Sequence, residues 1–149
     1  MTDIAKELIY LDKARASIKS HEGYSRVVYL DSVGVPTGGW GHAFLLNSGL
    51  PKEIWEQIFE YDFSNSKDGA YSIIQQRNLH DIGEVRKAVL IEMVFNLGLA
   101  GVLSFKNTLK YIESGDYEQA AANMLQSKWA TQVGQRAHTL ARRMRTGMF

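Results

Sequence analysis

The chain has 149 residues, a hydrophobic fraction of 45%, a charged fraction of 22% and a formal net charge of +1. That length is typical of one domain, and the composition excludes a disordered chain because enough apolar side chains are present to form a core. Cysteine is absent, which excludes disulfides and thiolate metal sites, so we expect a fold that can form in a reducing cytoplasm.

Targeting and membrane signals are weak in this sequence. The N-terminal region is polar and mixed in charge, and it does not have the pattern of a signal peptide. The most apolar run, Ala88 to Leu103, is too short to cross a bilayer and is interrupted by Glu92 and Asn96. We therefore expect no stable membrane insertion.

Residues 3–20 predict an amphipathic helix, which Thr2 or Asp3 can cap at its start. Its apolar positions follow helical spacing, and they include Ile4, Leu8, Leu11 and Ile18. We expect the first ten or so residues to have a structural role, packing on the larger part of the fold.

The stretch 22–42 carries the candidate chemistry. An apolar run, a turn signal from Asp31 to Gly34 and a second short strand signal together predict a β-hairpin. Such a hairpin can hold Asp31 and Thr37 near each other, with Glu22 facing them from the helix end. Two carboxylates nine residues apart are, by themselves, more often a turn residue and a solvated acid.

Helices dominate the rest of the chain. Pro51 can begin a helix, and the polar stretch 64–69 predicts a kink or short break in it, because Gly69 disfavours helix. The strongest helix signal covers 84–97 and ends at Gly98. Further helices are predicted from a Ser104 cap to about Gly115, from an Asp116–Gln119 capping box to about Lys128, and from Gln135 to Met144 with Gly147 beyond its end.

The order of motifs adds a family resemblance. Glu22, Asp31 and Thr37, followed by Gly39-Trp40-Gly41-His42, resemble the phage lysozyme family, and most closely its T-even endolysins. The C-terminal half matches the same family in order, with Arg86–Gly98, Ala120–Asn123, Ser127–Trp129, Gln135–Ala137 and Arg145–Gly147. The resemblance covers most of residues 18–149.

The resemblance implies a mainly α, α+β fold of lysozyme type. One catalytic domain would span 1–149, with a small β-hairpin lobe at about 22–65 and a larger helical lobe at about 1–20 and 70–149. The active-site cleft would lie between the lobes, and the stretch 64–69 would lie inside the long helix that joins them. An extra helix that the T-even enzymes carry after the matching histidine is missing here, which predicts a more compact small lobe.

The resemblance also implies roles for three residues. Glu22 would be the general acid, kept protonated by partial burial against the hairpin and Phe95, while Asp31 stays ionised and activates water together with Thr37. The reaction would invert the anomeric centre. No metal and no cofactor are implied. The positions that would contact saccharide are Ala43, in place of the family's leucine, and Phe95, Thr108 and Asn123.

Supporting residues follow from the same match. Arg136 corresponds to a family arginine that faces the catalytic glutamate, and His42 to a histidine paired with an aspartate, here Asp62. A metal or base role for His42 is the weaker alternative, since no second ligand lies at metal-binding spacing. His21 stands where the T-even enzymes have Asp, which changes the charge near Arg136 and the expected pH optimum.

The basic C-terminal region and Trp40 each have two possible interpretations. After Glu118 the chain has no acid, so its basic residues could form a polyanion-binding surface or a solvated helix face. Trp40 could stack on sugar or belong to the core. We expect Trp129 and Phe105 in the core, with the scattered methionines serving as packing.

The expected function is that of an endolysin. It would hydrolyse the β-1,4 bond between N-acetylmuramic acid and N-acetylglucosamine in peptidoglycan, acting as a monomer without nucleic acid. We expect the protein in the host cytoplasm until a holin-type pore admits it to the cell wall in the periplasm. The alternatives are a virion-associated lysozyme for wall entry and a non-enzymatic helical protein that binds polyanions.

Overall fold

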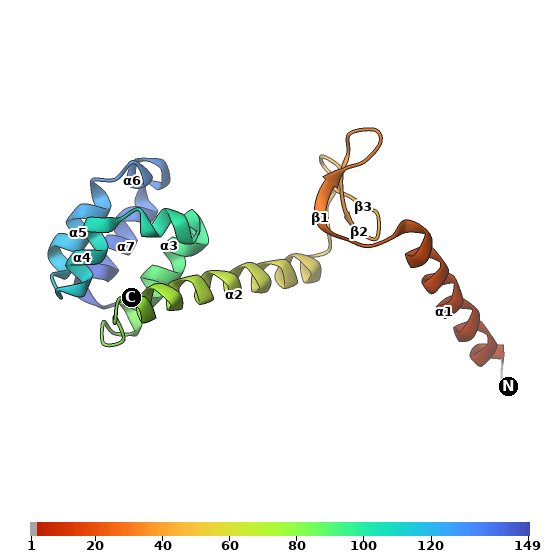
Figure 1. The fold of residues 1–149 in the computed structure, drawn as a ribbon, viewed down its shortest axis with the longest axis horizontal. Coiled ribbons are helices and arrows are strands. Elements are labelled where there is room, and N and C mark those ends of the chain that lie inside the picture. Colours follow the sequence, from red (N-terminus) through yellow and green to blue (C-terminus); the bar gives the residue numbers. More distant parts are fainter. Residues whose placement is uncertain (1–2) are drawn as a thin grey trace. The chain divides into compact units, whose positions relative to one another are not determined.

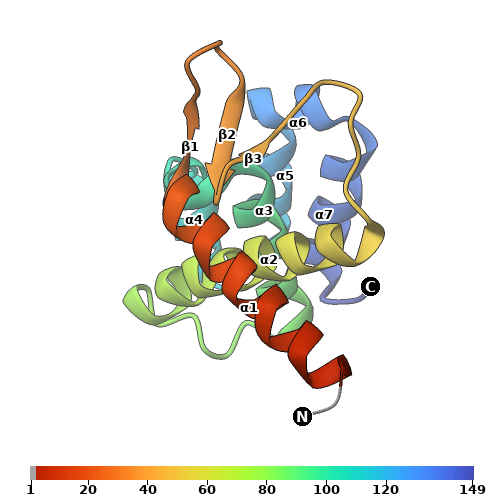
Figure 2. The same cartoon turned by 90° about the vertical axis from the view of Figure 1, so that its right-hand side faces the viewer.

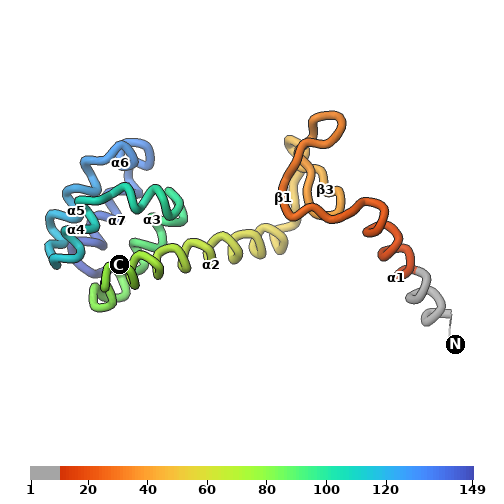
Figure 3. Tube along the Cα trace, viewed as in Figure 1, coloured from red at the N-terminus to blue at the C-terminus, as the bar shows by residue number. Residues whose placement is uncertain are grey.

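The computed structural model describes the backbone of residues 3–149 and the side chains from residue 11 onward (Figure 3). The chain divides into two compact units, Met1–Pro51 and Lys52–Phe149, called here the N-terminal and C-terminal units. The lobe bounds and the cleft that the sequence suggested stay predictions.

The N-terminal unit joins one helix to a small sheet (Figure 1). Helix α1 runs over Asp3–Glu22, and the antiparallel strands β1 (Ser25–Leu30), β2 (Pro36–Gly39) and β3 (His42–Ala43) lie side by side in that order (Figure 2). The predicted helix and hairpin are confirmed, with β3 as an addition. The predicted caps Thr2 and Asp3 and the apolar positions Ile4 and Leu8 lie outside the described side chains.

The turn between β1 and β2 is closed by the backbone. The N–H of Asp31 donates to the carbonyl of Val35 at 3.0 Å, and the N–H of Gly34 donates to the carbonyl of Asp31 at 3.1 Å. Gly34 has a φ of 82°, which a residue without a Cβ adopts at low cost. The register pairs Tyr29 with Thr37 in β2, and Thr37 with Ala43 in β3.

The C-terminal unit contains only helices among its described elements, α2 (Lys52–Gln76), α3 (Glu84–Leu103), α4 (Lys106–Glu113), α5 (Tyr117–Leu125), α6 (Lys128–Val133) and α7 (Gln135–Thr146). The break that local propensity predicted at 64–69 is wrong, because α2 is continuous through it, and the long helix that the resemblance implied there is confirmed. Gly69 is explained by packing on α3, since a Cβ there would lie 3.1 Å from Cγ1 of Val94.

Glycine and cap signals elsewhere succeed in part. Gly98 interrupts α3 with non-helical angles, and Gly147 ends α7 in the left-handed conformation. The side chain of Asp116 accepts the N–H of Gln119 at 3.1 Å, as the capping box predicted. The predicted Ser104 cap is wrong, because its hydroxyl bonds back to the carbonyl of Gly101 and α4 begins after Phe105.

The helix predicted to run to about Lys128 is shorter. Helix α5 ends at Leu125, and a separate helix, α6, begins at Lys128. The hydroxyl of Ser127 accepts the N–H of Ala130 at 3.1 Å and so caps α6. This local hydrogen bond competes with continuation of the preceding helix.

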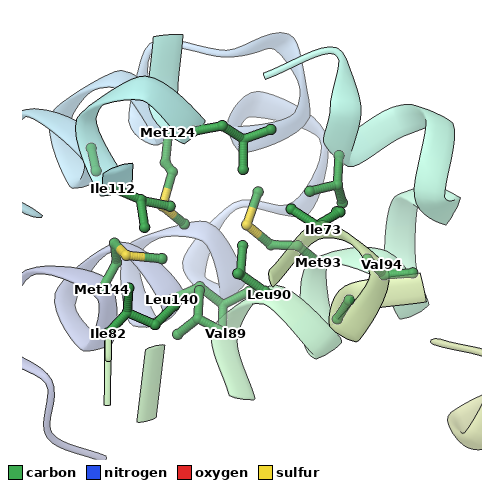
Figure 4. Close-up of a cluster of buried hydrophobic side chains, with 14 of the residues drawn as sticks. Ile73, Ile82, Val89, Leu90, Met93, Val94, Ile112, Met124, Leu140 and Met144 are labelled. Atoms are coloured by element: carbon green, nitrogen blue, oxygen red, sulfur yellow. The ribbon is translucent and has the colours of Figure 1, made fainter. Parts of the chain in front are cut away.

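The core of the C-terminal unit is built from apolar side chains of α2, α3, α4, α5 and α7 (Figure 4). Trp129 is buried and Phe105 packs against this core, as predicted, and three of the five methionines are buried there, Met93, Met124 and Met144. Within residues 3–149 no single helix is long and apolar enough to cross a membrane. Helices α3 and α4 meet that criterion only as a pair bent by 99°.

Candidate active site

Glu22 is the last residue of α1, and its carboxylate lies against the turn that follows β2. A Cβ atom on Gly41 would lie 2.9 Å from Oε2 of Glu22, which is closer than real Cβ contacts allow. Gly41 also has a φ of 80°. Glu22 is exposed within its unit, so the hairpin does not supply the partial burial that we predicted.

Asp31 stands at the first position of the β1–β2 turn and is half-buried. Its Oδ1 accepts two backbone N–H groups, from Val33 at 2.9 Å and from Val35 at 2.8 Å. Its other oxygen, Oδ2, receives no hydrogen bond from the described residues. The turn therefore holds the carboxylate by one oxygen, Oδ1.

Thr37 lies on β2 and is only 5% exposed. Its hydroxyl donates to the carbonyl of Val35 at 3.0 Å. Asp31 therefore binds the N–H of Val35, and Thr37 binds the carbonyl of the same residue. Because the hydroxyl hydrogen is used in this bond, Oγ1 of Thr37 can only accept a hydrogen bond from a further partner.

Two more predicted residues follow on β3. Ala43 is half-buried and pairs with Thr37 across the sheet, while His42 is exposed and meets the ring of Phe44 edge-on, with centroids 4.9 Å apart. Asp62, the predicted partner of His42, is an exposed residue of α2 whose carbonyl accepts the hydroxyl of Ser66. The His42–Asp62 pair stays a prediction.

In the C-terminal unit, Phe95 and Arg136 line one hollow of about 370 Å³. Phe95 is 39% exposed, and its ring centroid lies 5.7 Å from that of Phe59. Nε of Arg136 lies 3.1 Å from Oε1 of Glu92, and Nη1 of Arg143 lies 3.4 Å from Oε2 of the same carboxylate. Glu92 therefore holds two arginines, which the sequence analysis did not predict.

Thr108 and Asn123 are joined to each other. Oγ1 of Thr108 donates to Oδ1 of Asn123 at 2.8 Å, and Thr108 is only 1% exposed. Asn123 lines a separate hollow of about 720 Å³, to which Thr108 does not contribute. Thr108 therefore orients Asn123 rather than presenting its own hydroxyl at the surface.

The basic residues after Glu118 are mostly paired. Arg136 and Arg143 meet Glu92, and Arg145 lies 3.7 Å from Glu118, whereas Lys128 lines the larger hollow. This pairing favours the interpretation of a solvated, ion-paired helix face over a polyanion-binding surface. A charged residue within the apolar α3 sequence was the signal that could have identified Glu92.

Trp40 has two neighbours that the sequence did not predict. Nζ of Lys19 lies 4.1 Å from the centroid of its ring, and the Tyr24 ring lies 4.8 Å away, tilted by 47°. Trp40 is 47% exposed, so it is not a core residue of its unit. These contacts join residues distant in sequence, and only the glycine-rich sequence around Trp40 hinted at a close approach.

Comparison with known proteins identifies the family. The phage lysozyme family matches residues 19–146. The chain is 30% identical to "Probable T4-type lysozyme 2" of Dictyostelium discoideum over 122 residues, which are 78% of this chain and 72% of that protein. It is 32% identical to "Probable T4-type lysozyme 1" of the same organism over 93 residues, covering 62% of this chain and 55% of that protein.

A third relative is much longer than the shared region. The chain is 27% identical over 155 aligned positions to the "Pre-baseplate central spike protein Gp5" of Enterobacteria phage T4. The match covers 87% of this chain and 27% of that protein. The predicted resemblance and fold class are confirmed by the match and by the mostly helical structure with its small antiparallel sheet. The chain belongs to the phage lysozyme family, and it is a glycoside hydrolase, a lysozyme-type muramidase.

Proposed function

We propose that this protein hydrolyses the β-1,4 bond between N-acetylmuramic acid and N-acetylglucosamine in peptidoglycan, with inversion at the anomeric carbon. Glu22 protonates the leaving oxygen of N-acetylglucosamine. Asp31 and Thr37 hold the water that attacks C1 of N-acetylmuramic acid from the opposite face. Asp31 takes one proton from the attacking water while Glu22 gives one proton to the leaving oxygen, so the protons balance over the reaction.

The observation that supports this mechanism is the pair of hydrogen bonds that Asp31 and Thr37 make with Val35. The hydroxyl hydrogen of Thr37 is used on the Val35 carbonyl, so Oγ1 can accept one hydrogen of a water molecule. Oδ1 of Asp31 is used on backbone N–H groups, which leaves Oδ2 to accept the other hydrogen. A water that donates to both oxygens has a lone pair left for attack on the sugar.

The supporting residues belong to the same proposal. Phe95 and Asn123 contact saccharide from the C-terminal unit, with Ala43 contributing from β3. Arg136 matches the family's supporting arginine, and Glu92 shares its charge. No step requires a metal or a cofactor.

Analysis of new reducing ends tests which bond is cut. Purified peptidoglycan is digested, reduced with borodeuteride, hydrolysed to its amino sugars and analysed by mass spectrometry. The proposal predicts deuterium in muramitol. Deuterium in glucosaminitol would show cleavage of the other glycosidic bond, and 1,6-anhydro ends would show an intramolecular reaction without water. Either result would overturn the mechanism.

The biological role proposed is that of an endolysin, a monomer that waits in the host cytoplasm and reaches the wall through a holin-type pore. Expression in a Gram-negative host with and without a co-expressed holin tests it. Lysis only with the holin supports the role, and prompt lysis without it contradicts the need for a pore.

One observation favours a second role. The chain resembles part of a protein named as a baseplate spike component, which favours a virion-associated lysozyme. Mass spectrometry of purified virus particles separates the two roles. An endolysin is absent from washed particles, whereas a virion-associated enzyme is present at a fixed number of copies.

A further inference from the structure

Trp40 contacts both sides of the segment that carries Glu22. Lys19 lies three residues before Glu22, and its Nζ is 4.1 Å from the Trp40 ring centroid. Tyr24 lies two residues after Glu22, and its ring centroid is 4.8 Å from that of Trp40. One indole ring therefore touches the chain before and after the acid, within the N-terminal unit.

The backbone changes direction directly after Glu22. Helix α1 ends at Glu22, and Gly23 leaves it with a φ of 70°. The N–H of Gly23 donates to the carbonyl of Lys19 at 3.1 Å, which closes the last turn of the helix. Lys19 is thus tied to the helix end by its backbone and to Trp40 by its ammonium group.

Trp40 also lies next to Gly41, the glycine that packs against the Glu22 carboxylate. Trp40 precedes Gly41, and a Cβ on Gly41 would lie 2.9 Å from Oε2 of Glu22. Gly39 and Gly41 both have positive φ, so the turn between β2 and β3 could adopt other conformations if it were not held. The cation–π contact and the aromatic contact of Trp40 restrain this turn.

We propose that Trp40 is a positioning residue for Glu22. The stack of Lys19, Trp40 and Tyr24 holds the end of α1 against the β2–β3 turn, so that the carboxyl of Glu22 stays against Gly41. This inference rests on the proposed function, in which Glu22 is the acid. Trp40 touches no reacting atom in this account, and it acts through the place it gives to Glu22.

A sugar-stacking role for Trp40 predicts different kinetics. A residue that contacts saccharide in both ground and transition states changes KM, whereas a residue that places the acid changes kcat. The ring of Trp40 already has the Lys19 ammonium over one face and Tyr24 beside it. This arrangement favours the positioning role.

The test uses Trp40→Leu, Trp40→Phe and a matched control, Trp55→Leu. Trp55 is 49% exposed, close to the 47% of Trp40, and it has no aromatic or cation partner in the described part of the chain. On soluble peptidoglycan fragments, we expect Trp40→Leu to lower kcat about 10- to 100-fold with KM within about twofold, because a misplacement of about 1 Å costs that much. Trp40→Phe keeps a ring and should restore most of kcat, and Trp55→Leu should match the wild type.

Lys19→Met provides a second variant in case Trp40→Leu fails to fold. Removing the ammonium should lower kcat about threefold or more, because the cation–π contact that restrains the ring is lost. Lys13→Met on the same helix is the control and should have no effect on kcat. The double variant of Lys19 and Trp40 should be little worse than Trp40→Leu alone, because both act through one stack.

Two outcomes would overturn the inference. The first is an unchanged kcat in folded Trp40→Leu, or in Lys19→Met, with or without a raised KM. The second is an equal loss caused by Trp40→Leu in wild type and in a Glu22→Gln background, since an effect exerted through Glu22 must shrink when the acid is absent. If Glu22→Gln alone keeps wild-type activity, the proposed function fails instead, whatever Trp40 does.

Discussion

The carboxylate of Glu22 and the Cα of Gly41 lie so close that a Cβ on Gly41 would displace the carboxylate. A Cβ on Gly41 would be 2.9 Å from Oε2 of Glu22, and the backbone there has a φ of 80°. We expect Gly41→Ala to push the acid out of place and to lower kcat about 100-fold. Steady-state kinetics checks this.

Gly39→Ala is the matched control for that variant. Gly39 has a φ of 62° in the same turn, but a Cβ there meets nothing within 4 Å. Both variants share the backbone strain of about 1–2 kcal/mol, which thermal unfolding will show, and only Gly41→Ala adds the collision. Equal activity losses in the two would mean that contact with Glu22 is irrelevant.

Inversion is the second prediction. The bond that is cut is β, so the first product should carry the α anomer at its new reducing end. ¹H NMR of a soluble oligosaccharide during the first minutes of reaction shows which anomer forms before mutarotation. Thr37→Ser keeps the hydroxyl and should keep both rate and anomer. A retained β anomer from the wild type would exclude the role given to Asp31 and leave Glu22 as the acid.

A third prediction concerns the end of α7. Gly147 has a φ of 69°, and a Cβ there would lie 3.0 Å from Nη1 of Arg86. Nε of Arg86 donates to the carbonyl of Met144 at 2.7 Å, so this guanidinium holds the last turn. Gly147→Ala should lower the free energy of unfolding by about 2 kcal/mol or more, as measured by urea unfolding.

The control is Gly115→Ala after α4. Gly115 has a φ of 75°, but a Cβ there would meet nothing within 4 Å. It should cost only the conformational strain of about 1–2 kcal/mol. A loss in Gly147→Ala no larger than that in Gly115→Ala would show that Arg86 moves aside freely.

The fourth prediction concerns Glu92. Its carboxylate is 35% exposed and meets Arg136 and Arg143. Glu92→Gln removes the charge that two partly buried guanidinium groups share, and it should cost about 1–2 kcal/mol by urea unfolding after allowance for solvent screening. Glu118→Gln loses the exposed contact with Arg145 and an acid in the first turn of α5, and it should cost less than about 1 kcal/mol. Equal losses would show that Glu92 acts as an ordinary surface acid.

The parts of the fold that sequence predicted correctly carry local signals. The hairpin follows from its turn residues, the break in α3 from Gly98, and the end of α7 from Gly147. The helix break predicted around Gly69 is wrong for a non-local reason. Local propensity disfavours helix there, but α2 continues because the missing Cβ lets Val94 of α3 pack close. No local pattern contains that information.

The candidate site divides in the same way. The spacing of Glu22, Asp31 and Thr37 predicted one hairpin with a helix end before it, and the three residues lie there, while their catalytic roles stay a prediction. The contact with Gly41 and the stack on Trp40 depend on how α1 meets the turn between β2 and β3, and they join groups that no sequence periodicity relates. The hydrogen bonds to Val35 stay within the hairpin.

The role of Glu22 as the proton donor is tested most directly by Glu22→Gln. The amide keeps the size of the side chain but cannot give up the proton that the leaving oxygen needs. The measurement is the initial rate of new reducing ends from purified peptidoglycan, with thermal unfolding to confirm an intact fold. We predict a rate at least about 100-fold below wild type with an unchanged melting temperature. A correctly folded Glu22→Gln protein that works within a few-fold of the wild-type rate would contradict this account.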